Sequence, residues 1–411
     1  MPQWSAYTSG ERIKILRGRE VTQTDLAHMT GLALITVQKA EQDICLTLPT
    51  LLKISAALSV DASVILGQQA PRRTMERGDR AMLRQVSQAT HDTAAGLLPE
   101  SAEPVSDGVL ASSAELAWQH YWRGDYLTLG GVLVPLLTDA AVTCHVQPTS
   151  AAWQALSDAY QITACMANLL GARDLAYAAV GHAKHAAEHA GDELRAARVE
   201  SARSWVYLRD GRVTDSLELA QAASEGIEPS YRDASHERLT VYGNLLTHCA
   251  VTSARLDDTD RAGDFLSQVH AVGARLGDEY DFHGARFGPT TASTQAVGVN
   301  VTVGEHGKAL RLSADIHDGD LSGLADAARN RYKLDVALAQ ADAKMWDTSL
   351  DTLEGVLTDA PQWARHQALP NVILERVGRA STDRLRRLSK LVGVPVSTVG
   401  GFAEVDTQAA L

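Results

Sequence analysis

The chain has 411 residues, of which 45% are hydrophobic and 21% are charged, and its formal net charge is −12 at pH 7. This length predicts two or three domains, and the composition is typical of a folded protein with a large apolar core rather than a disordered chain. Because an acidic surface repels nucleic acid, the overall charge excludes a nucleic-acid interface spread over the whole molecule.

The sequence shows no sign of export or membrane insertion. No apolar stretch approaches the ~20 residues that span a bilayer, and Met1 to Gly10 lacks the features of a secretory signal. The cysteines lie far apart without a C-x-x-C pair, as is typical of reduced thiols: Cys45, Cys144, Cys165 and Cys249. We therefore expect a cytoplasmic protein that has no membrane span.

The positive charge gathers at the N-terminus. Residues 1–73 contain eight Lys or Arg against six Asp or Glu, a net of +2, so the remainder carries −14. Four of these cations lie within eight residues of one another: Arg12, Lys14, Arg17 and Arg19. Any contact with nucleic acid is expected in this segment.

Residues 11–67 predict five short helices. Ile13 and Leu16 give the first helix an apolar face, and Thr22 with Asp25 forms a capping-box start for the second. Gly31 supplies the left-handed turn that ends this second helix. A third helix is expected over residues 33–41, a fourth after Pro49, and a last turn at residues 64–66.

The motif Thr22-Gln23-x-x-Leu26-Ala27-x-x-Thr30-Gly31-Leu32, followed by Val37 and Glu41, resembles the Cro/C1-type (XRE) helix-turn-helix family. The resemblance implies a domain over residues 1–70 that places its third helix in the major groove of double-stranded DNA. It also implies a homodimer on a palindromic operator. The residues that match the family's DNA-contacting positions are Gln23, Leu34, Ile35, Thr36, Gln38 and Lys39.

The predicted recognition helix departs from the family. Leu34 and Ile35 are apolar where a polar side chain usually contacts a base edge, and residues 44–46 form an unusually apolar loop. Such side chains can touch a thymine methyl but supply no bidentate hydrogen bond. Three hypotheses stay open: specific DNA binding, weak or non-specific DNA binding, and a domain that contacts protein instead.

Residues 71–111 are predicted to be a linker. A helix over residues 73–91 would carry Met75, Met82, Val86 and Ala89 near one side. It could be a packed connector, or a dimerising or spacer helix.

From residue 112 to 411 the sequence predicts helix pairs. Their internal turns recur 39 to 47 residues apart at Gly124, Gly171, Gly211, Asp257, Gly304 and Ala343. A period near 40 residues is typical of an α-solenoid, and this one resembles a divergent tetratricopeptide-like array. The expected fold is thus all-α, a five-helix helix-turn-helix domain followed by a tetratricopeptide-like α-solenoid that acts as sensor and dimerisation domain.

A polar stripe follows the first helix of successive repeats. Its members lie thirteen or ten residues before the turns, and those that we assign as candidate ligand contacts are Asp158, Gln161, Arg198, Asn244, Thr291, Thr294 and Asn330. The stripe could be a solvated outer face, or a groove whose amides bind a peptide or a small polar molecule.

The segment Asp278 to Thr291 is the least repeat-like part of the array. Gly288-Pro289 suits the start of a helix. Alternatively the segment forms the lip of a ligand pocket, with Phe282, Arg286 and Phe287 within reach. Its Phe-Gly-Pro-Thr motif resembles helix-turn-helix–repeat regulators of filamentous actinobacteria.

Catalytic and metal-binding signatures are missing from the sequence. His182, His185 and His189 share a helix face but have no clustered acid or thiol to complete a metal site. There is no P-loop, no G-x-S-x-G and no H-E-x-x-H motif, so we expect no enzyme, cofactor or metal.

The combination resembles the peptide-pheromone sensors of Gram-positive bacteria, which join a helix-turn-helix to a repeat receptor. It implies a transcriptional regulator whose repeats bind a peptide or small-molecule signal, or a protein partner, and thereby control the geometry of a DNA-bound dimer. The alternative is an interaction scaffold with a vestigial helix-turn-helix.

Overall fold

The computed structural model describes residues 7–18, 21–58, 60, 62–67, 77–230, 234–378, 387–388 and 391. Within these ranges the chain is helical apart from one short β-hairpin. The all-α expectation is therefore confirmed.

The N-terminal part folds as five short helices, which we call the head: α1 (Ser9–Arg17), α2 (Gln23–Thr30), α3 (Leu34–Glu41), α4 (Leu48–Ala57) and α5 (Ala62–Ile65). Thr22 and Asp25 form the predicted capping box, each side chain accepting from the other residue's backbone N–H. Gly31 adopts the left-handed conformation, with φ of 64°. The head core is Ile13, Leu26, Val37, Leu51 and Ile54, all buried.

The helix predicted in the linker is α6 (Arg77–Ala94), and it packs on the rest of the molecule. Met82 and Val86 are buried, and Met82 lies so close to Gly130 that a β-carbon there would meet its side chain at 2.2 Å. Of the two readings, the packed connector is the one that the structure supports. Because α6 packs on α8, the array begins at residue 77 and not at residue 112, where the sequence predicts its start.

Six antiparallel helix pairs follow α6 in the described part of the chain. They are α7 (Asp107–Arg123) with α8 (Tyr126–Val146), α9 (Ser150–Leu169) with α10 (Arg173–Ala190), α11 (Glu193–Arg209) with α12 (Val213–Gly226), α13 (His236–Arg255) with α14 (Thr259–Leu276), α15 (Pro289–Thr302) with α16 (His306–Ala314), and α17 (Asp326–Asp342) with α18 (Trp346–Asp359).

Each pair turns through one residue of positive φ: Gly124, Gly171, Gly211, Asp257, Gly304 and Lys344. The predicted turns are confirmed, with one correction. The left-handed residue of the sixth turn is Lys344 (φ 64°), whereas Ala343 is the last residue of helical φ before it. The sixth repeat was therefore aligned one residue too early.

A β-hairpin joins α14 to α15. Strand β1 (Tyr280–Phe282) pairs antiparallel with β2 (Ala285–Phe287), and Asp281 lies opposite Arg286. Both residues of its two-residue turn, His283 and Gly284, have positive φ, which is the requirement of a type I′ turn. Pro289 begins α15, as expected. The hairpin also borders the central cavity described below, but of the three residues expected there only Arg286 lines it.

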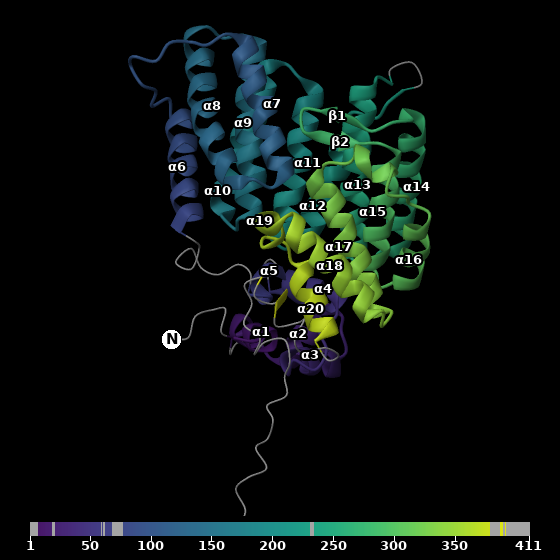
Figure 1. Ribbon diagram of the computed structural model, residues 1–411. Helices are drawn as coiled ribbons and strands as arrows, with labels where there is room; N and C mark the ends of the chain where they lie inside the picture. Colours follow the sequence, from purple (N-terminus) through teal and green to yellow (C-terminus); the bar gives the residue numbers. More distant parts are fainter. Residues whose placement is uncertain are drawn as a thin grey trace, which may run out of the picture.

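The array curves until its last pair meets its first (Figure 1). Helix α17 packs against α7, and the short α19 (Pro361–Ala364) places Trp363 against Gly124, whose β-carbon would meet that side chain at 2.6 Å. The turn η3 (Asp320–Gly323) connects α16 to α17. Helix α20 (Leu369–Val377) follows α19 and runs between the array and the head.

Helix α8 corrects the expectation that no apolar stretch is long enough to cross a membrane. It has 21 residues and passes that test by length and composition. More than half of its apolar window is buried, and it packs against α6, α7 and α9. In this structure α8 is thus a core helix.

Candidate functional site

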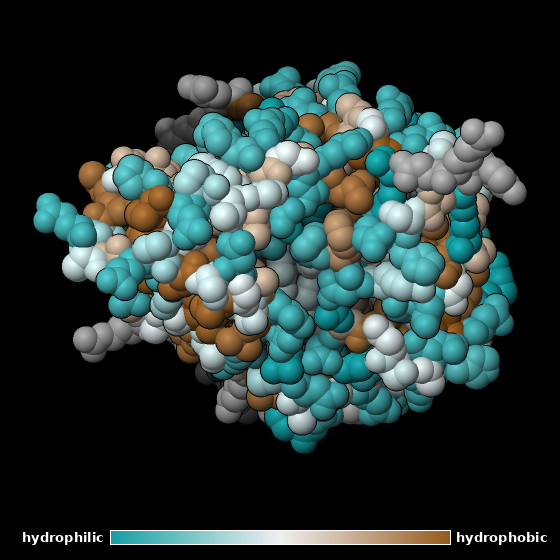
Figure 2. All heavy atoms as spheres, turned by 90° about the horizontal axis from the view of Figure 1, so that it is seen from above, coloured by the Kyte–Doolittle hydropathy of each residue, from teal (hydrophilic) through white to brown (hydrophobic). Residues whose placement is uncertain are grey.

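A cavity of about 360 Å³ lies at the centre of the curved array. The first helix of every pair contributes to its wall, together with the hairpin, η3, α19 and Tyr126 at the start of α8. Seen from the end opposite the head, the surface is depressed between the two sides of the array, with polar and apolar groups interspersed around it (Figure 2). The curvature of the array forms this space, which is partly open to solvent.

The polar stripe is not a solvated outer face. Asp158, Gln161, Arg198, Thr294 and Asn330 are all buried, with at most 6% of their surface exposed. The candidate residues that line the cavity are Arg198, Asn244, Thr291 and, from the hairpin, Arg286.

Six other candidate contacts do not line it. Phe287 is a core residue, fully buried against Gly243, and Phe282 packs against a small apolar cluster. Thr294 donates its hydroxyl to the carbonyls of Thr290 and Thr291 within its own helix. The remaining three are Asp158, Gln161 and Asn330.

The misaligned sixth turn explains the error at Asn330. Thirteen residues before Lys344 lies Arg331, and Arg331 does line the cavity. One residue along a helix rotates a side chain by about 100°, so the shift moved the prediction off the inner face. With that correction, the inner positions are Arg198, Asn244, Thr291 and Arg331.

The inner stripe also continues toward each turn at helical spacing, which sequence reasoning missed. On α11 it adds Trp205, and on α13 it adds His248 and Arg255. Burial, with a smaller effect of the nearby Arg198 charge, lowers the pKa of His248 to about 3, so this imidazole is neutral at physiological pH. Extending the stripe by three and four residues could have found these positions.

Arg198 is the most deeply buried arginine of the cavity wall, with 6% of its surface exposed. Its Nη2 donates to the carbonyl of Gly284 over 3.2 Å, and its guanidinium lies 5.7 Å from the ring centroid of Trp118. No carboxylate of the described residues lies within 4.0 Å of it, and its Nε has no hydrogen-bond partner there.

The three carboxylates of the wall are already engaged. Asp281 pairs with Arg286 over 2.8 Å, and Asp335 pairs with Arg331 over 3.1 Å. Glu279 accepts hydrogen bonds from the backbone N–H and the hydroxyl of Thr291, so it caps the first turn of α15. Thr291 is thereby also occupied.

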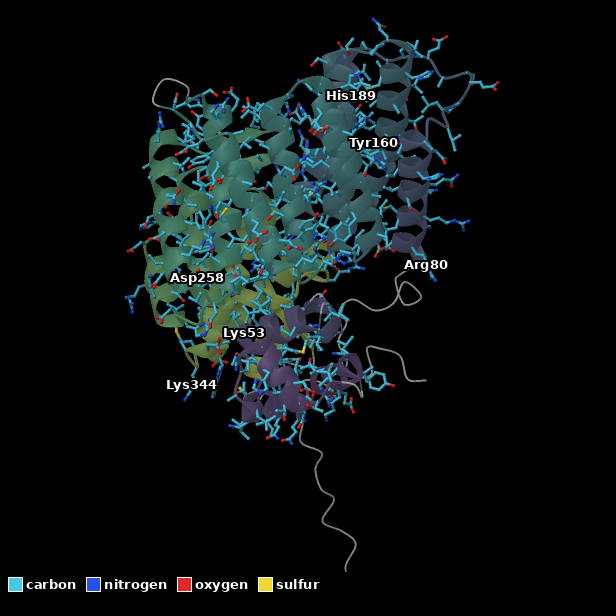
Figure 3. All side chains as sticks on the ribbon, turned by 180° about the vertical axis from the view of Figure 1, so that it is seen from behind. Lys53, Arg80, Tyr160, His189, Asp258 and Lys344 are labelled. Atoms are coloured by element: carbon cyan, nitrogen blue, oxygen red, sulfur yellow. The ribbon has the colours of Figure 1, made fainter. Side chains whose placement is uncertain are left out.

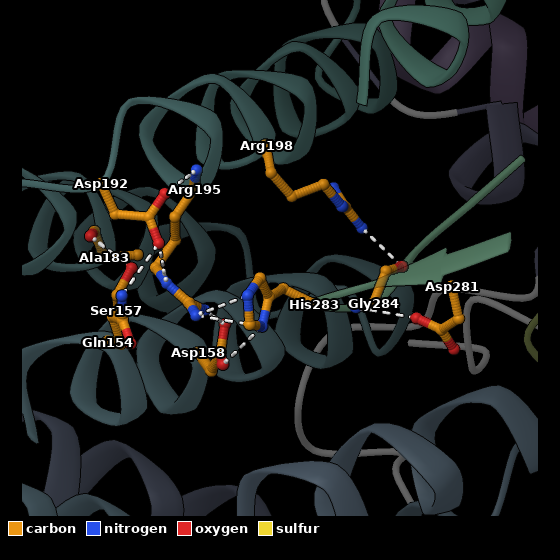
Figure 4. Close-up of polar contacts among 10 residues, drawn as sticks. All are labelled: Gln154, Ser157, Asp158, Ala183, Asp192, Arg195, Arg198, Asp281, His283 and Gly284. Carbon is orange, nitrogen blue, oxygen red and sulfur yellow. Dashed lines mark hydrogen bonds and ion pairs between the residues drawn. The ribbon is translucent and has the colours of Figure 1, made fainter. Parts of the chain in front are cut away.

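Asp158 belongs to a separate buried cluster at the hairpin tip (Figure 4). Arg195 binds Asp158, approaches Asp192 at 3.3 Å, and reaches the ring nitrogens of His283 at 3.0 and 3.1 Å. Arg195 and Asp158 are 1% and 5% exposed. The cluster fastens the hairpin to α9 and α11, which is a structural role.

On the head, the predicted DNA-contacting residues divide into exposed and engaged ones. Leu34, Ile35 and Lys39 are exposed on α3, while Thr36 and Gln38 are half-buried. Gln23 donates its amide to the buried Glu41 over 2.7 Å.

The basic run of α1 is less exposed than its sequence suggests. Arg12 is buried and donates to the carbonyl of Ile65, and Arg17 pairs with Glu41 over 2.7 Å. Lys14 is exposed, and Arg19 lies outside the described residues. Two of these cations therefore hold the head together.

The head packs on the array through several polar contacts. Lys53 pairs with Asp257 over 2.7 Å, and Ser9 donates to Glu375 over 2.9 Å. Figure 3 shows Lys53 where the head meets the array, beside the end that carries Asp258. A second, smaller crevice lies between α4 and α5 of the head and the array. It shares five wall residues with the central cavity: Trp205, Arg255, Thr302, Arg331 and Gln367.

These features define a helical-repeat protein with a central cavity, lined by arginine and aromatic side chains, that adjoins a small N-terminal helical domain. Neither a protein-family model nor a curated protein matches the chain. Among the described residues no group of three or more His, Cys, Asp or Glu is arranged to hold a metal ion.

Proposed function

We propose that this protein is a DNA-binding transcriptional regulator whose repeat array binds a signal in its central cavity. The head would bind DNA as a helix-turn-helix, and the array would change how two heads are held in a homodimer. The observation that carries this proposal is the shared wall between the cavity and the head crevice.

That shared wall gives a physical route from signal to head. A molecule in the cavity would touch side chains, among them Arg331 and Trp205, that also border α4 and α5. If the signal binds one arrangement of head and array more tightly than another, it shifts the population toward that arrangement.

The charge distribution supports placing DNA at the head. The array is acidic and would repel phosphates, whereas α3 lies on the side of the head away from the array, with Lys39 exposed (Figure 1). The engaged Gln23 would have to exchange Glu41 for a phosphate, so we expect its contribution to be smaller than that of Lys39.

The experiment is a selection of bound duplexes from a random pool by the full-length protein. Enriched pairs of half-sites about 34 Å apart, or a multiple of it, would support a dimeric helix-turn-helix. On a selected site, Lys39→Ala should flatten the slope of log K against log salt by about one. Lys308→Ala, an exposed lysine on α16, is the control and should leave that slope unchanged.

A second candidate function has one observation in its favour. The head exposes five large apolar side chains, namely Ile15, Met29, Leu34, Ile35 and Ile44. Exposed apolar groups favour a protein contact over the acidic backbone of DNA. Suppose that no duplex is enriched, and that a partner protein binds the wild type but not the Leu34→Asp variant. That result would support an interaction scaffold instead.

A further inference from the structure

The strongest unexplained feature of the cavity is the positive charge of Arg198. A guanidinium that is 94% buried normally has a carboxylate partner, because removing an unpaired charge from water is costly. Arg198 is 6% exposed and has none within 4.0 Å among the described residues. Its neighbours are a backbone carbonyl and the face of Trp118.

Nothing else in the described wall supplies the missing negative charge. Asp281, Asp335 and Glu279 are engaged by Arg286, Arg331 and Thr291. His248, beside Arg198, is neutral and cannot act as a counter-ion. Outside the wall, Asp158 is close enough to feel the charge of Arg198, but it is bound by Arg195.

The rest of the wall suits a flat apolar body. Six aromatic side chains line the cavity, and they are Tyr121, Trp122, Tyr126, Trp205, Tyr280 and Trp363. A volume of about 360 Å³ is at the small end of the range for ligand pockets, about 300–1,000 Å³. An extended peptide of six residues, about 20 Å long, does not suit such a compact space.

Polar groups that could orient a ligand are also present. Asn244 accepts a hydrogen bond from Ser201 through its Oδ1, over 2.7 Å. Its amide nitrogen has no partner among the described residues, so it remains able to donate to a ligand oxygen.

We propose that the cavity binds a compact organic monoanion, an aromatic or alicyclic monocarboxylic acid, whose carboxylate pairs with Arg198 and whose ring lies among the aromatic side chains. The guanidinium fork matches a carboxylate in shape and charge. This inference deepens the proposed function by giving the chemical class of the signal.

The test uses the full-length protein without DNA. A panel of aromatic and alicyclic monocarboxylates is compared with the corresponding primary amides, which have the same size and no charge. We expect at least one acid to raise the melting temperature and to bind in calorimetry, with its amide binding about tenfold more weakly or worse. A panel in which no acid stabilises the protein more than its amide would overturn the proposal.

Variants assign the effect to Arg198. Arg198→Gln should weaken binding of the acid by about tenfold or more and leave binding of the amide unchanged, whereas Arg311→Gln, an exposed arginine on α16, should change neither. Should Arg198→Gln fail to fold, Arg198→Lys takes its place, with an expected loss of about threefold because the fork is lost and the charge is kept. An acid that binds the Arg198 variants as tightly as the wild type would place the anion elsewhere and contradict the proposal.

Because DNA is absent from this test, its outcome is separate from that of the proposed function. If the protein binds the acid selectively but enriches no duplex, the monoanion site stands and the proposal of a DNA-binding regulator fails. If the protein enriches duplexes but binds no acid in preference to its amide, the DNA-binding proposal stands and the monoanion site fails.

Discussion

Arg195 shows at the scale of a single residue how the hairpin is held. Its guanidinium, 1% exposed, joins Asp158 of α9 to His283 at the hairpin tip. Arg195→Met keeps the volume of the side chain but leaves the Asp158 carboxylate buried and unpaired. Breaking such a pair from one side costs about 3–5 kcal/mol, so we expect the free energy of unfolding to fall by that amount in denaturant titrations.

Arg329→Met is the matched control, because Arg329 pairs with Asp326 near the surface. An exposed pair contributes about 0–1 kcal/mol, so this variant should unfold close to the wild type. Equal losses in the two variants would show that burial does not set the strength of the Arg195 contact.

The residues of the inner face could be predicted only where the turn residue of the repeat was identified correctly, because the prediction counts back from that residue. Glycine marks four of the six turns, and counting back from it identified Arg198 and Thr291 correctly. In the sixth turn the left-handed residue is Lys344, which nothing in its type distinguishes from Ala343. Asn330 was chosen in place of Arg331 for that reason.

The hairpin is the element on which the cavity most depends. Gly284 has φ of 74°, and a β-carbon there would meet the Trp118 ring at 2.5 Å. Gly284→Ala is therefore strained by its backbone and also collides with α7. We expect a loss of more than about 2 kcal/mol in the free energy of unfolding, measured by thermal and denaturant unfolding.

Gly96→Ala separates these two causes. Gly96 has nearly the same φ, 71°, but nothing lies within 4 Å of its added β-carbon. Only the backbone strain, about 1 kcal/mol, should appear. If the free energy of unfolding fell equally in both variants, the contact with Trp118 would contribute nothing to the loss in Gly284→Ala.

Most elements were predictable because their local chemistry is strong. The Thr22 capping box, Gly31 and Pro289 begin or end helices where they were expected. The hairpin was not predicted, since strands of three residues are too short to show alternation and His283 is an unusual residue at positive φ.

The closure of the whole array could not be predicted from local pattern. It depends on contacts between distant segments, such as Trp363 with Gly124 and His366 with Tyr126, whose rings lie 5.8 Å apart. Sequence periodicity gives the repeats but leaves their accumulated curvature open. A groove was expected, and the described residues form a central cavity that is partly open to solvent.

Docking of the head on the array should depend on pH through Glu375. Burial and, to a smaller extent, the Asp43 charge raise the pKa of this carboxyl from 4.5 to about 7, against the opposing effects of the Ser9 hydrogen bond and of the Arg12 and Arg376 charges. Between these values the folded protein binds more protons than the unfolded chain, so stability falls as pH rises. Glu375→Gln mimics the protonated form and should melt above the wild type at pH 8.

The two proteins should melt closer together at pH 5, because Glu375 is then protonated in the folded state. Melting curves at both values give the comparison, with Ser9 able to donate to either side chain. If the difference in melting temperature between the two proteins is the same at pH 5 and pH 8, the Glu375 carboxyl does not titrate between these values in the docked protein.

The central claim is that occupancy of the cavity controls the head, and a filled cavity tests it most directly. Ala202 lines the cavity on α11 and is not part of the head crevice. Ala202→Phe would occupy part of the space that we assign to the ring of the ligand. On the duplex selected by the wild type, measured by fluorescence anisotropy with the melting temperature as a control for folding, we predict that its affinity differs by about tenfold or more, a typical coupling strength. A folded Ala202→Phe protein with wild-type affinity would contradict the claim.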